Sequence, residues 1–216
     1  MADGAVGAAR LGSAYKSRKR ERRRAEVLDA AAAVFAEKGF HTATLKDIAD
    51  RLNLLPASLY HYVASKEAAL VEVCQRTNDR NIDGMAEILA APPPYRPSIG
   101  AAVRLHMLNN RRELVQSFAF RRKDLPAQAS RALARMAARY QAQWEELLER
   151  AAGAGELRAG IDPKSTALAI LSMCNGAIDR YESRPPGEIS RLADDFTSLI
   201  LDGLAPTGAG RSNDGD

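Results

Sequence analysis

The chain has 216 residues, of which 46% are hydrophobic but only 6% aromatic, and it carries a net charge of +4 and two cysteines. That length holds one large domain or a small one joined to a medium one, and an apolar set dominated by Ala and Leu favours helices. Apolar runs fall short of the ~18–20 residues of a membrane span, and no signal-peptide segment precedes the first basic run, which excludes a membrane protein and predicts a cytoplasmic one. Cys74 and Cys174 have no CxxC spacing, so we expect two buried thiols and neither a disulfide nor a redox pair.

The excess of basic residues is concentrated near the N-terminus. Residues 1–66 hold 12 Lys and Arg against 7 Asp and Glu, a net charge of +5, whereas residues 67–216 hold 19 against 20, a net charge of −1. Seven of the nine residues in Lys16–Arg24 are basic. We expect residues 1–19 to be a disordered arm that follows a nucleic-acid backbone or enters a minor groove. The alternative is a solubilising tail that also opens the first helix.

Residues 20–64 are predicted to hold three helices. The first has apolar residues at helical spacing and ends at Gly39. Thr44 and Asp47 fit a capping box that begins the second, and Pro56 suits the first position of the third. The buried positions of the first helix are predicted to be Val27, Ala30, Ala31, Val34 and Phe35. Two short helices joined by a tight turn make a helix-turn-helix, whose second helix fits the major groove of DNA.

Residues 65–205 are predicted to form a second helical domain. Its first helix begins at Ser65–Glu67 and runs to about Leu89, where a cluster of prolines breaks the chain. Further helices are expected at residues 98–119, 126–154, 162–182 and 188–204, and residues 206–216 as a disordered tail. Because no segment alternates apolar and polar residues as a strand does, the predicted fold class is all-α.

Four sequence elements stand in order in the first part of the chain: AEKGF, TLKDIA, LPASLYHYV and SKEAAL. This arrangement resembles the N-terminal domain of the TetR (tetracycline-repressor) family over roughly residues 20–75. GELRAGIDP, residues 155–163, resembles a turn common in that family's C-terminal half. The resemblance implies a three-helix helix-turn-helix DNA-binding domain followed by a helical ligand-binding and dimerisation domain.

The resemblance also implies roles in DNA binding. Thr44 would cap the second helix and touch a phosphate, while Lys46 would reach a base or the backbone. Small residues of the third helix would meet base edges, and longer basic side chains would position the domain on phosphates. The predicted DNA-binding residues are Lys16, Arg18, Lys19, Arg20, Thr44, Lys46, Pro56, Ala57, Ser58, Tyr60, His61 and Lys66.

Two residues depart from the family's pattern. Asn53 stands where the family usually has Gly, and Asn is the next best residue for a left-handed backbone. Leu55 stands where the family often caps the third helix with Ser or Thr. Leu55 is expected to pack against a thymine methyl instead, so both departures affect the operator sequence and neither affects the fold.

For the second domain, the resemblance implies a small-molecule cavity and a homodimer formed through residues about 162–204. The predicted ligand-binding residues are Met85, Leu89, Leu105, Leu108, Phe118, Arg121, Arg122, Tyr140, Trp144, Met173 and Tyr181. Arg121 and Arg122 would hold the phosphates of a CoA thioester, as in the family's acyl-CoA-responsive branch. The alternatives are a solvated helix end for the basic pair and ordinary core positions for the apolar residues.

These features favour a ligand-responsive transcriptional regulator, a repressor that binds a palindromic operator as a dimer and is released by an apolar or acyl-CoA-type effector. We expect no cofactor and no metal, because His41 and His106 are isolated from each other and from any Cys. A sequence-neutral architectural protein that uses only the basic arm is the alternative. A small helical enzyme is less favoured, since the sequence offers no catalytic residues: no nucleophile elbow, phosphate loop or paired carboxylates.

Overall fold

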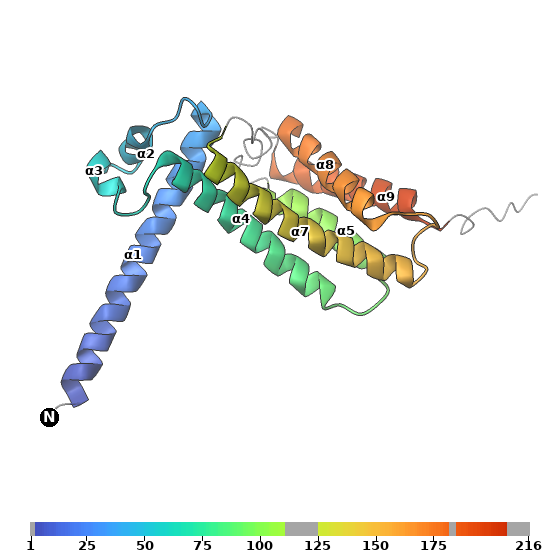
Figure 1. Ribbon diagram of the computed structural model, residues 1–216, viewed down its shortest axis with the longest axis horizontal. Helices are drawn as coiled ribbons and strands as arrows, with labels where there is room; N and C mark the ends of the chain where they lie inside the picture. Colours follow the sequence, from blue (N-terminus) through green and yellow to red (C-terminus); the bar gives the residue numbers. More distant parts are fainter. Residues whose placement is uncertain (1–2, 111–124, 182–184, 207–216) are drawn as a thin grey trace, which may run out of the picture. The chain divides into compact units, whose positions relative to one another are not determined.

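The computed structural model describes residues 3–110, 125–181 and 185–206, which form helices and the turns between them (Figure 1). Within these ranges there is no strand, which confirms the predicted all-α class. The helices are α1 Asp3–Lys38, α2 Leu45–Arg51, α3 Pro56–Leu59, α4 Lys66–Leu89, α5 Arg96–Asn110, α7 Ala127–Gly153, α8 Pro163–Tyr181 and α9 Pro186–Leu204. None of the described helices is long and apolar enough to cross a bilayer.

The chain divides into two compact units, one ending at Val73 and the other beginning at Cys74. The division falls inside α4, so the first part of this helix belongs to the N-terminal unit and the rest to the C-terminal unit. The sequence placed the domain boundary between residues 64 and 65, at the start of the same helix. Helix α4 is therefore the one element that both units share among the described residues.

In the N-terminal unit, the second half of α1 supplies the core. The predicted stripe from Val27 to Phe35 is buried, and it packs with α2, which in turn packs with α3. Ile48 of α2 and Leu59 of α3 are wholly buried. The ring of Phe35 meets Phe40 edge to face at 5.5 Å. This core fixes the helix-turn-helix on α1.

Helix α1 begins at Asp3, which corrects the prediction of a disordered arm over residues 1–19. No proline interrupts the segment, and Ala, Arg and Lys have high helix propensities, so a helix nucleated by the buried half continues toward the N-terminus. Glu26 adds support within the helix, because it pairs with Arg22 at 3.4 Å and with Arg23 at 2.6 Å. The basic run therefore lies on a helix and not on an extended arm.

The predicted caps and turn of this unit are present. The backbone N–H of Asp47 donates to Thr44 Oγ1 at 3.2 Å, and the N–H of Thr44 donates to Asp47 Oδ2 at 2.8 Å, which completes the capping box of α2. Ser65 Oγ accepts from the N–H of Ala68 at 3.1 Å at the start of α4. Asn53 has a φ of 52°, the left-handed conformation expected for the turn.

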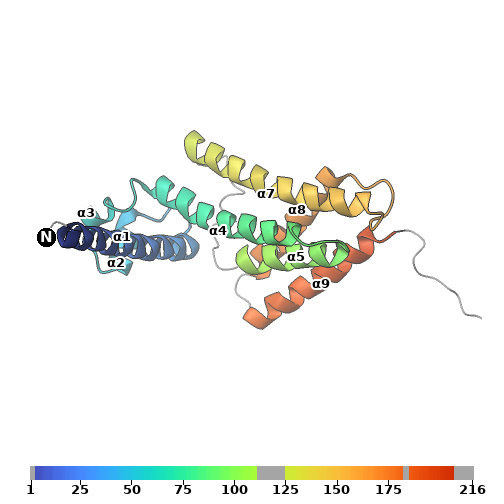
Figure 2. The ribbon, with the colours of Figure 1, turned by 90° about the horizontal axis from the view of Figure 1, so that it is seen from below.

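The C-terminal unit is a bundle of the second part of α4 with α5, α7, α8 and α9. Helix α5 packs mainly on α9, and α7 on α8 (Figure 2). Its core includes wholly buried Met85 from α4, Ile99 from α5, Trp144 from α7 and Cys174 from α8. Burial raises the pKa of the Cys174 thiol to about 12, which keeps it protonated and unreactive.

Residues 155–163 connect three helices of this bundle. The carboxylate of Glu156 accepts from the backbone N–H of Tyr95 at 2.7 Å and of Arg96 at 2.9 Å, where α5 begins. The N–H of Arg158 donates to the carbonyl of Leu204 at 2.9 Å, at the end of α9. Asp162 caps α8 by accepting from the N–H of Ser165 at 2.9 Å. Helix α5 was predicted to reach residue 119, but residues 111–124 lie outside the described ranges.

Candidate nucleic-acid interface and ligand cavity

The third helix exposes the residues that the sequence assigned to base edges. Leu59 is wholly buried and anchors α3, while Pro56 and Ala57 are exposed and Ser58 is half-buried. The chain makes one more turn after α3, since the N–H of Val63 donates to the carbonyl of Leu59 at 3.1 Å. Tyr60 is 61% exposed on this turn, and His61 is also exposed.

Two ion pairs join α1 to α2 and so orient the helix-turn-helix. Lys38 Nζ lies 2.6 Å from Asp47 Oδ1, and Arg51 Nη1 contacts both carboxylate oxygens of Glu37 at 2.8 and 2.9 Å. The hydrogen bond from Lys38, followed by those from Thr44, lowers the pKa of Asp47 to about 2. These contacts keep α2 and α3 in a fixed orientation on α1 without using the exposed side of α3.

Two lysines predicted to meet DNA have partners within the protein. Lys46 is exposed and pairs with Asp50 at 2.6 Å, and this hydrogen bond raises the pKa of Lys46. Lys66 Nζ donates to the carbonyl of His41 at 3.2 Å and lies 4.6 Å from the centre of the Phe40 ring. An ammonium group has three donors, so Lys66 keeps capacity for a phosphate while it ties α4 to the loop before α2.

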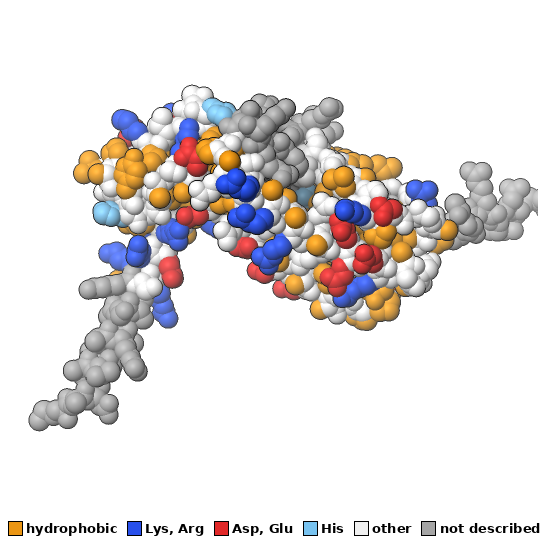
Figure 3. All heavy atoms as spheres, in the orientation of Figure 1, with side chains coloured by type: hydrophobic (Ala, Val, Ile, Leu, Met, Phe, Trp, Pro, Cys, Tyr) orange, Lys and Arg blue, Asp and Glu red, His pale blue; other side chains and the backbone are white. Residues whose placement is uncertain are grey.

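Basic side chains line two depressions between α1 and the turn that follows α3. Arg20 and Tyr62 line both of them, with His61 in one and Lys19 in the other. Arg18, Lys19 and Arg20 are exposed, and Lys and Arg side chains gather on the described part of α1 (Figure 3). The side chain of Lys16 lies outside the described residues. The structure thus brings the basic run and the end of the helix-turn-helix to one surface.

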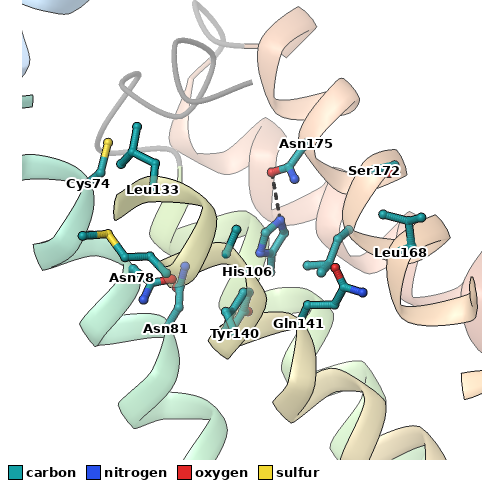
Figure 4. Close-up of a pocket in the computed structure, with 13 residues that line it drawn as sticks. Cys74, Asn78, Asn81, His106, Leu133, Tyr140, Gln141, Leu168, Ser172 and Asn175 are labelled. Atoms are coloured by element: carbon teal, nitrogen blue, oxygen red, sulfur yellow. Dashed lines mark hydrogen bonds between the residues drawn. The ribbon is translucent and has the colours of Figure 1, made fainter. Parts of the chain in front are cut away.

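A cavity of about 170 Å³ lies within the C-terminal unit (Figure 4). Helices α4, α5, α7 and α8 all contribute to its wall. The lining residues are Cys74, Asn78, Asn81, His106, Leu133, Met136, Ala137, Tyr140, Gln141, Leu168, Leu171, Ser172 and Asn175. None of these is a Lys, Arg, Asp or Glu, so the described wall of the cavity is uncharged.

A hydrogen bond between α5 and α8 fixes the polar side of the cavity. His106 Nε2 lies 3.0 Å from Asn175 Oδ1, and because an amide oxygen only accepts, Nε2 carries the hydrogen. Burial lowers the pKa of His106 to about 4, and the bond to Asn175 only partly opposes this. The ring therefore stays neutral at physiological pH, stacked on Tyr140 with ring centres 5.7 Å apart.

Polar side chains from α4 and α7 complete this side of the cavity. Asn81 Oδ1 accepts from Asn109 Nδ2 at 3.0 Å, and Gln141 donates to Glu145 at 2.8 Å. Tyr140 Oη is buried without a hydrogen-bond partner among the described residues. Burial is the main reason that the pKa of Tyr140 is raised, and the nearby Trp144 N–H opposes that rise without reaching hydrogen-bond geometry. The phenol therefore remains neutral.

Of the predicted ligand-binding residues, only Tyr140 is among the described residues that line this cavity. Met85 and Trp144 are wholly buried in the core, Leu89, Leu105 and Met173 pack against the core, and Leu108 is 38% exposed. Phe118, Arg121 and Arg122, and the side chain of Tyr181, lie outside the described residues. Their role in binding stays a prediction.

Sequence reasoning missed the amides of the cavity because it searched for Met and aromatic residues. A usable signal was present: Asn78 and Asn81 on α4, and Ser172 and Asn175 on α8, are polar pairs three residues apart beside otherwise apolar stripes. No cluster of three or more His, Cys, Asp or Glu suited to a metal occurs in the described part of the chain.

Comparison with known proteins agrees with this architecture. Residues 27–73 match the family described as "Bacterial regulatory proteins, tetR family", and residues 98–204 match "Tetracyclin repressor-like, C-terminal domain". The HTH-type transcriptional repressor KstR2 of Rhodococcus jostii is 30% identical over 188 residues, which cover 85% of this chain and 91% of the relative.

Two solved structures share the fold. The ketosteroid transcriptional regulator KstR2 of Mycobacterium tuberculosis superposes with a TM-score of 0.73 at 23% identity, covering 85% of this chain and 95% of that one. FadR of Bacillus subtilis, solved in complex with stearoyl-CoA, gives a TM-score of 0.70 at 16% identity, covering 83% and 98%. With a helix-turn-helix in one unit and a cavity-bearing helical bundle in the other, the chain belongs to the TetR family of DNA-binding transcriptional regulators.

Proposed function

We propose that this regulator is a repressor that binds a palindromic operator as a homodimer and leaves it when a small molecule enters the C-terminal cavity. The observation that supports the proposal is that the two units of one chain carry different kinds of surface. An exposed α3 with a basic α1 surface lies in one unit, and an uncharged cavity lies in the other. In KstR2 of R. jostii, 30% identical, the described role is also that of a repressor.

Operator binding would combine the two surfaces of the N-terminal unit. Pro56, Ala57 and Ser58 would meet base edges, where small side chains allow close approach. Arg18, Lys19 and Arg20 would contact phosphates, which set the register and supply most of the affinity. Thr44, Lys46, Tyr60, His61 and Lys66 would add the remaining contacts on the groove wall and backbone.

The dimer would form through α8 and α9. Leu168 is 56% exposed on α8 and Leu199 is 61% exposed on α9, so each helix carries an apolar side chain that is not covered within the monomer. A side chain added at Gly176 or Gly203 would meet no described neighbour, and glycines on open helix faces allow another helix to approach closely. Dimerisation would place two recognition helices about 34 Å apart, one turn of DNA.

The cavity supports an effector whose buried part is uncharged and carries oxygen atoms. Burying a charge without a partner costs far more than burying a hydroxyl or carbonyl that is hydrogen-bonded. Ser172, Asn175 and the neutral His106 offer such hydrogen bonds beside the apolar Leu133 and Leu171. A CoA thioester remains compatible if its charged phosphates stay outside this uncharged cavity.

Transmission to DNA would pass through α4. Asn78 and Asn81 of α4 line the cavity, while Glu72 on the same helix pairs with Arg24 of α1 at 2.7 Å. A ligand that moves α4 would therefore change the position of the helix-turn-helix. Release requires that the ligand bind the DNA-incompetent state more tightly, since equal affinity for both states shifts nothing.

The operator is tested by incubating the purified protein with a genomic fragment library near physiological salt and sequencing the bound fragments. We expect a short inverted repeat, and a dimer bound to it in sedimentation velocity. Enrichment of fragments without a shared site would contradict operator recognition and favour the sequence-neutral architectural alternative.

The effector class is tested with three probes that share one ring system: naphthalene, 2-naphthol and 2-naphthoate. We expect 2-naphthol to raise the melting temperature most and 2-naphthoate least. The double variant H106F/N175L replaces both members of this hydrogen bond with apolar groups, so that neither is left without the other. In that variant 2-naphthol should lose its advantage over naphthalene, and an advantage that persists would exclude the polar side of the cavity as the binding site.

A further inference from the structure

Leu55 is the most exposed large apolar side chain within the described residues, at 74%. It directly precedes α3, and Tyr60, at the other end of this helix, is 61% exposed. Hydrophobic side chains accordingly gather at the tip formed by α3 in the view of Figure 3. The recognition surface therefore has an apolar end, although its unit is basic overall.

The side chain at this position adds little to the stability of the free protein. Leu55 is the N-cap of α3, with φ −68° and ψ 137°, the backbone conformation in which Ser, Thr, Asp or Asn would accept a hydrogen bond from the first turn. No side-chain cap is present. The exposed isobutyl group also gains almost nothing from burial. Residues that break local rules without a benefit to the fold are expected at functional sites.

The chemistry around Leu55 points to DNA as its partner. Pro56 and Ala57 beside it are exposed and small, so the backbone here can enter a groove. Lys46, on the preceding helix, is also exposed, so the same helix-turn-helix carries a cation that can meet phosphates. An apolar side chain on a helix-turn-helix in a basic unit fits one group on DNA: the C5-methyl of thymine, the apolar group that the major groove presents.

We propose that Leu55 determines operator specificity by contacting the methyl group of a thymine in each half-site. The proposal rests on operator binding by α3. Contact with the methyl removes both it and the leucine methyls from water, while cytosine, adenine and guanine offer no such group at that place. A serine at this position would cap α3 but would not discriminate in this way.

The experiment replaces each thymine of the selected operator in turn by deoxyuridine, which lacks only the C5-methyl. For the natural protein we expect one position in each half-site at which the substitution weakens binding about fourfold, the effect of about one buried methyl group. For L55S, the operators with thymine and with deoxyuridine should bind equally well. L55S should also melt roughly 2–4 °C higher because it restores a cap.

Two further variants separate the side chain from the cap. L55M keeps an apolar side chain and adds no cap, so it should retain discrimination between thymine and deoxyuridine. L55A adds no cap and removes the contact, so it should lose discrimination. If L55S or L55A discriminates as the natural protein does, or if no thymine is sensitive, the proposal is overturned while operator binding stands. If no fragment forms a specific complex, the proposed function fails as well.

Discussion

In the N-terminal unit, ion pairs between helices stabilise the fold. In the C-terminal unit, the described part of the cavity wall consists of uncharged side chains. Lys38–Asp47 and Arg51–Glu37 hold α2 on α1 at the surface, and further cations face outward on α1. In the bundle, His106 is buried and neutral and is held by the amide of Asn175. The contrast agrees with the proposed ligands: exposed cations suit a polyanion, and hydrogen bonds that need no charge suit the uncharged part of a small molecule.

Lowering the pH should destabilise the C-terminal unit at a higher pH than the N-terminal unit. This is the largest effect that we expect. His106 would bind a proton near pH 6.5 in the unfolded chain but only near pH 4 in the folded one. Between these values the unfolded state holds more protons, so stability falls as the pH falls, by on the order of 3 kcal/mol in total. Asp47 affects stability at lower pH. Its pKa of about 2 lies below the ordinary value of 3.8, so its contribution to stability is complete above pH 3.8 and is lost only toward pH 2.

The single tryptophan allows the acid unfolding of the C-terminal unit to be measured. Trp144 is wholly buried in the C-terminal unit, so its fluorescence reports unfolding of that unit during an acid titration. In H106Q, which does not titrate, the midpoint should move to lower pH, while D47N should leave it in place. An unchanged midpoint in H106Q would mean that other groups govern acid unfolding of the bundle.

Removing charge from α1 should weaken DNA binding without touching the cavity. For R18A/K19A/R20A we expect operator affinity to fall on the order of 100-fold at 0.15 M salt, and the dependence of log affinity on log salt to flatten by about 0.9 for each phosphate that the variant no longer neutralises. Binding should be measured by fluorescence anisotropy over a range of salt concentrations. Stabilisation by 2-naphthol should be unchanged.

A matched control removes the same charge from the other unit. Arg131, Arg135 and Arg139 are exposed on α7. R131A/R135A/R139A should leave the salt dependence nearly unaltered, because these residues lie outside the DNA-binding unit. Equal losses in both triple variants would indicate that only total charge matters and that the α1 surface has no special role.

The difference between the two units also explains why the sequence predicted the helix-turn-helix but not the lining of the cavity. The helix-turn-helix depends on local chemistry: Thr44 and Asp47 of the capping box are three residues apart, and Pro56 opens the helix that it precedes. The cavity depends on tertiary packing, since His106 and Asn175 lie 69 positions apart and only the bundle brings them together. The helical start of α1 was missed because its Gly- and Ala-rich composition resembles that of disordered segments, while the buried half of the helix lies further along the chain.

The smallest expected effect concerns Asn53, where a purely local interaction shapes the recognition surface. Its φ of 52° costs most residues about 1–2 kcal/mol, but Asn tolerates it and Gly is free of the restriction. N53A should therefore destabilise the turn by about 1 kcal/mol, while N53G should stay within about 0.5 kcal/mol. Hydrogen exchange of the amides of α2 and α3 measures this locally, and about 1 kcal/mol corresponds to roughly fivefold faster exchange. Exchange in the C-terminal bundle should not change, because the turn belongs to the other unit. Equal exchange in N53A and N53G would mean that the side chain of Asn53, and not its backbone conformation, stabilises the turn.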